Sequence, residues 1–470
     1  MKHIRNPYFL STGLAVIAGV VLRLWLLSGL NHHYYQGGTL AWHASHALAI
    51  TQGKSMSVDT RFVKLLQEAQ LLSDRIIDPQ DIPPGFKQNP DKPWPSMDVP
   101  GYGFLLAAFW SFLPGKYIYV QIFQILLDLL AIILVAETCR RLFNRTTGGI
   151  SSWLYALWPI PAIFSCLAHR DYFGIFGIVL FIFAISSFVK TNGDNPAKQR
   201  RWFWMWVAGV ALGIFSWIRP MWVTLVIFQP VFLWIYMGWA KAWRSFLVLS
   251  SSVIVLFFLP LSLMNMKIHG RPFVSPVGLS LWQSLGEDKN PYGFAASDLE
   301  AWQYAALVKG IPADSLNVPE ANDILLARVI EVARMDPGFV LTSLARRGFR
   351  VITLGYSSFL FLPFEKGMVF WSWPFTLIRY LHKLAWLLAI SGFLLAGNYF
   401  GYRKTALLWA PPLAIFLTFW PTRFADPRFF FVSLVIFVFF LSAGVWVVQR
   451  RTMEIFKRRI GFSHHDQNNP

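Results

Sequence analysis

The chain has 470 residues, of which 55% are hydrophobic, 17% aromatic and 14% charged, and its formal net charge is +18. Soluble domains carry roughly 25% charged residues, so this composition excludes an ordinary soluble globule. Nucleic-acid binding is disfavoured as well, because the basic residues fall in small clusters between apolar runs and form no single patch. We therefore predict an all-α polytopic membrane protein that binds no nucleic acid.

Several apolar runs reach the length of about 20 residues that a helix needs to cross the hydrocarbon core, and none alternates like a barrel strand. Unpaired backbone groups are costly in lipid, so these runs predict helices. The first run is followed by a poor cleavage site and is predicted to be a retained helix rather than a signal peptide. We expect about ten transmembrane helices. They are predicted at residues 9–30, 117–138, 147–167, 172–189, 203–218, 221–238, 245–266, 374–397, 405–421 and 428–449.

The positions of the basic residues predict the orientation. Every short loop on one side of this layout is basic, which is typical of the cytoplasmic side. Both termini then lie in the cytoplasm, and two long segments lie on the outer side, periplasmic or lumenal. The chain is thus divided into an N-terminal membrane module (1–266) that includes the first outer segment (31–116), a second outer segment (267–373), C-terminal membrane helices (374–449) and a cytoplasmic tail (450–470). We expect the membrane to be a bacterial inner membrane.

The first outer segment opens with HHYYQGGTLAWHASHALAITQGK, residues 32–54, which contains four histidines and no carboxylate. His43 and His46 are three residues apart and are expected to share one helix face. Their unperturbed pKa near 6.5 suits a general base, and one of them could also bind a metal ion. The competing interpretation is that both are hydrogen-bonded packing residues in an aromatic interface.

Two segments outside the spans are predicted to lie on the membrane surface. PGYGFLLAAFWSFLPG, residues 100–115, is too short to span comfortably and is predicted to be an interfacial helix. In EANDILLARVIEVARMDPGFVLTSLARRGFRVI, residues 320–352, apolar residues recur every three to four positions between arginines. This pattern is typical of amphipathic helices, and we expect these arginines to pack on the bilayer.

Ionisable residues at membrane depth are expensive and often functional. Asp128, in QILLDLLAI, is the clearest case. It lies roughly midway along its helix, where a reaction at the membrane surface could hardly reach it. We therefore favour a structural role, as an acid hydrogen-bonded to a neighbouring helix, over a functional one.

Three predicted outer turns carry arginine at the membrane surface. Arg170 precedes Asp171 in AHRDYFG, Arg219 lies in SWIRPMW, and Arg423 and Arg428 flank an aspartate in PTRFADPRFF. Arginine offers a planar fork of donors that suits phosphate. The alternative is that each arginine and its neighbouring aspartate satisfy each other, but three turns on one face favour a phosphate site at the outer membrane boundary.

The motifs in chain order resemble a known family. They are CRRLF, WLYALWPIPAIFSCLAHRDYFGIF, GVALGIFSWIRPMW, HGRPFVSPVGLSLW, MDPGFVLTSLARR and FADPRFFF, after the Pro-Gly-Tyr segment. Together they resemble the GT-C glycosyltransferases of the dolichyl-phosphate-mannose protein mannosyltransferase and aminoarabinose transferase kind, over nearly the whole chain. The resemblance implies a GT-C fold and transfer of a sugar, usually with inversion, from a polyprenyl-phosphate-linked donor. It also implies a glycan, lipid or protein acceptor on the outer face, as in cell-envelope biosynthesis.

The family usually places an acid in the first outer loop, and this chain lacks it. The helix end ALAITQG, at Gly53, matches the family, and counting back by the family's spacing lands on Gly37, Gly38 and Thr39. By the same resemblance, Asp171 matches the family's second outer-loop acid and is the leading candidate for the catalytic base.

Other groups remain candidates for the base. Asp59 and Asp98 are weaker carboxylate candidates, and His43 or His46 could replace the carboxylate altogether. From the three outer turns, we expect Arg170, Arg219, Arg423 and Arg428 to bind the donor phosphate. No cofactor is predicted with certainty, and a divalent cation, with unknown ligands, stays open.

Two other functions are compatible with these residues. The missing acid and the abundance of His and Arg favour a polymerase or ligase that uses a lipid-pyrophosphate-linked glycan. A non-catalytic subunit that binds lipid-linked glycan, or a transporter, is the other possibility, although no internal repeat is visible. The sequence contains no GxxxxGK[ST] motif, which argues against ATP-driven transport by this chain alone.

Overall fold

The computed structural model describes most of the chain, and the account below is confined to that part. The described residues are 7–29, 39–54, 57–72, 77–81, 92–93, 99–191, 198–274, 276–312, 318–353, 385–422 and 428–459. Almost all of the regular structure in these ranges is helical. One short antiparallel pair joins β1 (Ser57–Val58) to β2 (Lys92–Pro93), with Ser57 opposite Pro93. The prediction of an all-α protein is confirmed.

Five helices among the described residues are long and apolar enough to cross a membrane. They are α1 (Pro7–Gly29), α6 (Ile118–Leu142), α9 (Asp171–Thr191), the continuous helix α12–η3–α13 (Trp239–Val253, Ile254–Phe258 and Leu259–His269) and α22 (Arg428–Arg459). Shorter apolar helices lie among them: α10 (Lys198–Ser216), α11 (Leu225–Met237), α19 (Ala385–Phe400) and α21 (Ala410–Thr422). The polytopic membrane class is confirmed, whereas the number of spans stays a prediction.

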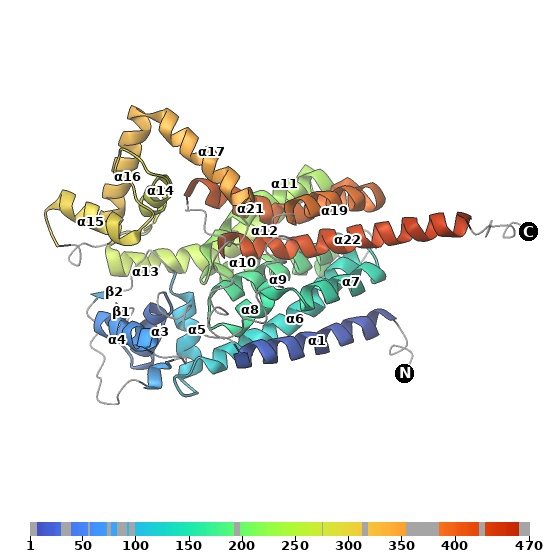
Figure 1. Cartoon of the computed structure of the whole chain (residues 1–470), viewed down its shortest axis with the longest axis horizontal. Coiled ribbons are helices and arrows are strands. Elements are labelled where there is room, and N and C mark those ends of the chain that lie inside the picture. Colours follow the sequence, from blue (N-terminus) through green and yellow to red (C-terminus); the bar gives the residue numbers. More distant parts are fainter. Residues whose placement is uncertain are drawn as a thin grey trace, which may run out of the picture.

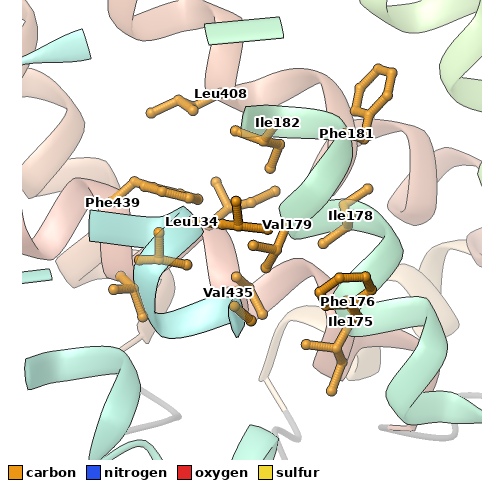
Figure 2. Packing of buried hydrophobic residues seen from close by; sticks show 14 of the residues in the cluster. Leu134, Ile175, Phe176, Ile178, Val179, Phe181, Ile182, Leu408, Val435 and Phe439 are labelled. Carbon is orange, nitrogen blue, oxygen red and sulfur yellow. The ribbon is translucent and has the colours of Figure 1, made fainter. Parts of the chain in front are cut away.

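Helix α9 is the centre of the membrane core. Of its apolar window, 89% is buried inside the protein, the largest share among the five long helices. Figure 2 shows its side chains interleaved with those of α6, α22 and the short turn η7 (Leu407–Trp409). The labelled residues are Leu134, Ile175, Phe176, Ile178, Val179, Phe181, Ile182, Leu408, Val435 and Phe439. Such close packing holds membrane helices together where lipid offers no hydrophobic drive between them.

The predicted span 147–167 is not one helix. The structure has α7 (Arg145–Ala156) and α8 (Pro159–Cys166) instead. Trp158 is extended, with φ −69° and ψ 120°, because it precedes a proline. The expectation of one continuous helix is therefore wrong.

Asp128 is ion-paired with Arg23 inside the bundle, and both side chains are fully buried. Nε of Arg23 donates to Oδ2 of Asp128 at 2.5 Å, and the hydroxyl of Tyr155 donates to Oδ1 at 2.8 Å. Nη1 of Arg23 also donates to the carbonyl oxygens of Gly19 and Ala156. The structural role predicted for Asp128 agrees with these contacts, which join α1, α6 and α7.

Both long segments between the spans lie at one end of the bundle, opposite the end that holds the two termini (Figure 1). The first contains α3 (Thr39–Thr51), α4 (Thr60–Leu72), the short turn η1 (Pro79–Asp81) and α5 (Gly101–Trp110). The second contains α14 (Val277–Leu285), α15 (Asp298–Lys309), α16 (Val318–Met335) and α17 (Pro337–Thr353). The common placement of the two segments agrees with the predicted layout, without showing which side of the membrane they occupy.

The second segment has a core of its own. Trp282, Leu325 and Val332 are among its buried residues. Arg347 of α17 is also buried, and its Nε lies 3.9 Å from a carboxylate oxygen of Glu287. The prediction that the arginines of these helices pack on the bilayer is therefore wrong for Arg347, which faces the protein interior.

Candidate active site

Helix α3 presents His43 and His46 on the face that packs against α5. Both histidines are buried, and they are flanked on α3 by small residues that allow close helix packing, Ala44 and Ala47. The ring of His43 meets Tyr102 edge to face, with centroids 5.3 Å apart, and the ring of His46 lies 5.5 Å from that of Phe104. The shared helix face predicted for the two histidines is confirmed.

The glycines of the PGYG motif make this packing possible. A Cβ atom at Gly103 would overlap Nδ1 of His46, and one at Gly101 would overlap the backbone oxygen of Trp217. The backbone N–H of Gly101 donates to that same oxygen at 2.9 Å. Gly101 thus ties α5 to the end of α10, and Gly103 leaves room for an imidazole.

The turn between α8 and α9 brings Asp171 to the same place. Asp171 is the first residue of α9, where the helix dipole favours a negative charge. Its carboxylate is ion-paired with Arg219, which follows α10 and is held extended by Pro220. The other carboxylate oxygen lies 3.3 Å from Nδ1 of His169, and the backbone N–H of Asp171 donates to that nitrogen at 3.2 Å.

Arg170 connects this turn to α3. Its Nη1 lies 3.4 Å from Nε2 of His43, and because a guanidinium can only donate, the imidazole nitrogen is the acceptor. Phe173 and Ala168, on either side of the turn, belong to the same buried cluster as Tyr102. Segments far apart in the sequence are therefore joined in one site: Arg219 and His169 contact Asp171, and Arg170 contacts His43.

The histidines on α3 are held neutral at physiological pH. Burial, and then the guanidinium of Arg170, lower the pKa of His43 well below its ordinary value of 6.5. Burial lowers the pKa of His46 to about 4. Both imidazoles are therefore uncharged, and the positive charge of the site comes from Arg170 and Arg219.

Asp59 has a structural role in the fold. Its Oδ1 accepts from the backbone N–H groups of Arg61 and Phe62, at 3.0 and 3.2 Å, which caps the N-terminus of α4. Its own backbone N–H donates to the hydroxyl of Ser45 at 2.8 Å, so the cap is also tied to α3. These hydrogen bonds explain why the carboxylate of Asp59 is buried, and no catalytic role is needed to explain its burial.

Several predicted site residues fall where the structure gives no side chain. Asp98 and Arg423 lie outside the described residues, and for Arg428 only the backbone at the start of α22 is described. The third arginine turn therefore stays a prediction. His169, in contrast, was missed by the sequence reasoning, although it precedes Arg170 in the same AHRDYFG motif.

The comparisons with known proteins agree with this architecture. A family model for dolichyl-phosphate-mannose-protein mannosyltransferases matches residues 100–267. The archaeal oligosaccharyltransferase AglB from Archaeoglobus fulgidus, with an inhibitory peptide and a dolichol-phosphate, superposes with a TM-score of 0.50 and 13% identity, over 99% of this chain and 53% of that one. Its apo form gives a TM-score of 0.52 and 12% identity, over the same shares. AglB is a GT-C enzyme. This chain has the GT-C fold.

The chain spans about half the length of those oligosaccharyltransferase chains. No curated protein matches it. Arg170, Asp171 and Arg219 all lie within the range that the mannosyltransferase family model covers, whereas His43 and His46 precede it. The family match therefore includes the turn that carries the carboxylate and omits the helix that carries the two imidazoles.

A metal site is not evident in the part of the chain that the structure describes. Within those residues, no group of three or more His, Cys, Asp or Glu side chains is placed to hold a metal ion. Around Asp171, the neighbours are arginines, whose positive charge opposes a cation. Asp171 and its described neighbours therefore do not form a cation site.

Proposed function

We propose that this protein is a membrane glycosyltransferase that moves a sugar from a polyprenyl-phosphate-linked donor to a glycan, lipid or protein acceptor on the extracytoplasmic face. The observation that carries the proposal is the grouping of Arg170, Arg219 and His43 around Asp171, at the end of the bundle that holds both inter-span segments. A lipid-linked phosphate presents its head group at such a boundary. Cationic donors there are suited to a leaving phosphate.

The proposed reaction is a single displacement. The acceptor hydroxyl gives its proton to the carboxylate of Asp171, and its oxygen bonds to the anomeric carbon. The bond from that carbon to the phosphate oxygen breaks, and the phosphate leaves with the electron pair. The guanidinium groups of Arg170 and Arg219 neutralise the charge that develops on it. Attack from the face opposite the leaving group implies inversion.

The comparisons support the chemical class of donor and acceptor. The family model belongs to mannosyltransferases named for a dolichyl-phosphate donor, and one similar structure holds a dolichol-phosphate and a peptide. The predicted orientation, with cytoplasmic termini in a bacterial inner membrane, is part of the proposal. So is the division of the chain into a membrane module, a second outer segment and C-terminal helices.

A transfer assay with purified protein tests the proposal. Radiolabelled polyprenyl-phosphate sugars are supplied with a mixed acceptor extract, and wild type is compared with Asp171→Asn. We expect the substitution to lower the rate about 10²–10⁴-fold, the usual contribution of a general base. Glu331→Gln is the matched control, because Glu331 is an acid on α16 paired with Arg328. Full activity of Asp171→Asn would remove Asp171 from the mechanism.

The excess of arginine side chains over carboxylates at the site favours one alternative, a pyrophosphate-linked donor. Among the described residues, two arginines and one carboxylate meet at the site, which suits a pyrophosphate as well as a monophosphate. A polymerase or ligase would then use a lipid-pyrophosphate-linked glycan. The same assay with that donor separates the two functions, and a His43→Gln variant shows whether the imidazole replaces the carboxylate as base.

A further inference from the structure

Two glutamines of the membrane helix α6 are buried and point towards the turn that carries Asp171. Gln121 and Gln124 are three residues apart, so they share a face of α6 with Asp128, four residues further on. A buried amide in an apolar bundle costs several kcal/mol unless it is hydrogen-bonded. The amide nitrogens of both side chains therefore need acceptors, and the structure provides them.

The partners are backbone carbonyls at the end of α8 and in the loop that follows. Nε2 of Gln121 donates to the carbonyl oxygen of Cys166 at 2.7 Å. Nε2 of Gln124 donates to the carbonyl oxygens of Leu167 at 2.8 Å and Phe164 at 3.1 Å, with that of His169 at 3.4 Å.

These carbonyls belong to a segment that helix bonding cannot hold. The last carbonyls of a helix have no partner within the helix, and α8 ends at Cys166. Between Cys166 and Asp171 the backbone–backbone hydrogen bonds are short-range, such as the one from the N–H of His169 to the carbonyl of Leu167 at 2.7 Å. The two glutamine amides thus fasten the backbone immediately before the arginine and the aspartate of the site.

We propose that Gln121 and Gln124 are positioning residues, which hold the Leu167–Asp171 turn so that Arg170 and Asp171 face α3 and Arg219. The inference rests on the proposed function, because it assigns the turn a catalytic task. The glutamines touch no reacting group themselves. They act through the turn, and a small displacement of that turn would separate Asp171 from its acceptor.

The first test measures the turn directly and needs no turnover. Gln124→Met and Gln121→Met keep the side-chain length and remove the donor. Hydrogen–deuterium exchange of the peptide that covers residues 164–173 is expected to become at least tenfold faster in Gln124→Met, with peptides of α6 and α22 unchanged. Gln229→Met is the matched control, because Gln229 is equally buried on α11 and its Nε2 has no partner among the described residues. Unchanged exchange in both α6 variants would overturn the proposal.

The second test uses the transfer reaction. We expect Gln124→Met to lower kcat at least tenfold and to change KM for the acceptor less than twofold. If the glutamine acts through Asp171, the double variant Gln124→Met/Asp171→Asn is no slower than Asp171→Asn alone. Additive losses would mean a general structural role and would overturn the assignment.

The two tests separate this inference from the proposed function. Wild type that transfers no sugar with any donor would refute the proposed function. The exchange measurement would still decide whether the glutamines hold the turn. Thermal unfolding in detergent shows that each variant is folded before it is compared.

Discussion

At the scale of single residues, the decisive feature is the charge balance at Asp171. One carboxylate, almost fully buried, lies against the guanidinium of Arg219, with Arg170 on the neighbouring residue. The ion pair holds the guanidinium of Arg219 at the place where, in the proposed reaction, a leaving phosphate would need it. In the proposed reaction, the same arginine stabilises the fold before the donor binds and neutralises the charge of the leaving phosphate afterwards.

Arg219→Gln is expected to damage both roles. Breaking a buried pair by removing one partner costs about 3–5 kcal/mol of unfolding free energy, because the other charge stays buried. Donor KM is expected to rise at least tenfold as well. Arg271→Gln is the control: Arg271 is paired with Asp323 on the exposed surface, and its loss should cost less than about 1 kcal/mol. Equal effects of the two substitutions, in unfolding and in donor titration, would contradict this account.

The buried histidine His46 predicts a loss of stability in acid. The unfolded chain binds a proton with the ordinary pKa of 6.5, but the folded protein binds it only near pH 4. Unfolding therefore takes up a proton between these values, and the folded state loses up to about 1.4 kcal/mol per pH unit as the pH falls through that window. Above pH 7 the group has no effect.

The measurement is the unfolding midpoint in detergent between pH 7.5 and 4. In the variant His46→Gln, unfolding is expected to take up one proton fewer, so that its stability falls less steeply with decreasing pH than that of wild type. The stability above pH 7 is expected to be nearly unchanged. A slope identical to that of wild type would show that the imidazole of His46 is not buried in its neutral form.

At the scale of elements, the buried pair between α1 and α6 is the clearest test of how the helices are joined. Arg23→Met or Asp128→Leu alone leaves an unpaired charge in the bundle and is expected to cost about 3–5 kcal/mol. The double variant Arg23→Met/Asp128→Leu removes both charges and should recover most of that loss. Unfolding in a denaturing detergent titration provides the comparison. A double variant less stable than either single one would refute the proposed pairing.

Elements that depend on neighbouring residues in the sequence could be predicted, whereas contacts between distant residues could not. The long spans follow from runs of apolar residues, because such a run is stable as a helix in the hydrocarbon core without a specific partner in the protein. The helix expected over 147–167 breaks at Trp158 because two prolines follow closely. These prolines were visible in the sequence, but the prediction gave more weight to the continuous hydropathy of the segment. Arg23, in contrast, is 105 residues from Asp128 in sequence, and only the folded structure reveals the pairing.

The candidate site was predictable to a similar extent. Arginine in successive turns indicated that Arg170 and Arg219 would lie near Asp171, and the structure brings them together. The contribution of His169 was not found, because a histidine beside a charged pair is common in sequence. The roles of Gly101 and Gly103 depend on close approach to Trp217 and His46, which hydrophobic periodicity cannot show.

At the scale of the whole molecule, the structure separates two ends of the bundle. The termini lie at one end, and α3–α5 and α14–α17 lie at the other (Figure 1). If the predicted orientation is right, a substrate delivered by a lipid meets the site from the side opposite both termini. The arrangement makes sidedness testable without any knowledge of the substrate.

Cysteine labelling tests this orientation. The native cysteines, Cys139 and Cys166, are buried. The labelling of a single introduced cysteine can therefore be distinguished from that of the two native thiols. Leu307→Cys, on α15, is expected to react with a membrane-impermeant maleimide in intact spheroplasts, whereas Thr452→Cys, near the end of α22, should react only after permeabilisation. The reverse pattern would invert the predicted topology.

The pairing of Arg23 with Asp128 also constrains how the protein is made. A ribosome adds about 5–20 residues per second, so the aspartate emerges roughly 5–20 s after the arginine. During that interval the first helix carries an unpaired guanidinium. Insertion of an arginine at the centre of a helix by the translocon costs about 2.5–3.5 kcal/mol. We therefore expect nascent α1 to linger beside the translocon until α6 arrives, and to enter the lipid together with it.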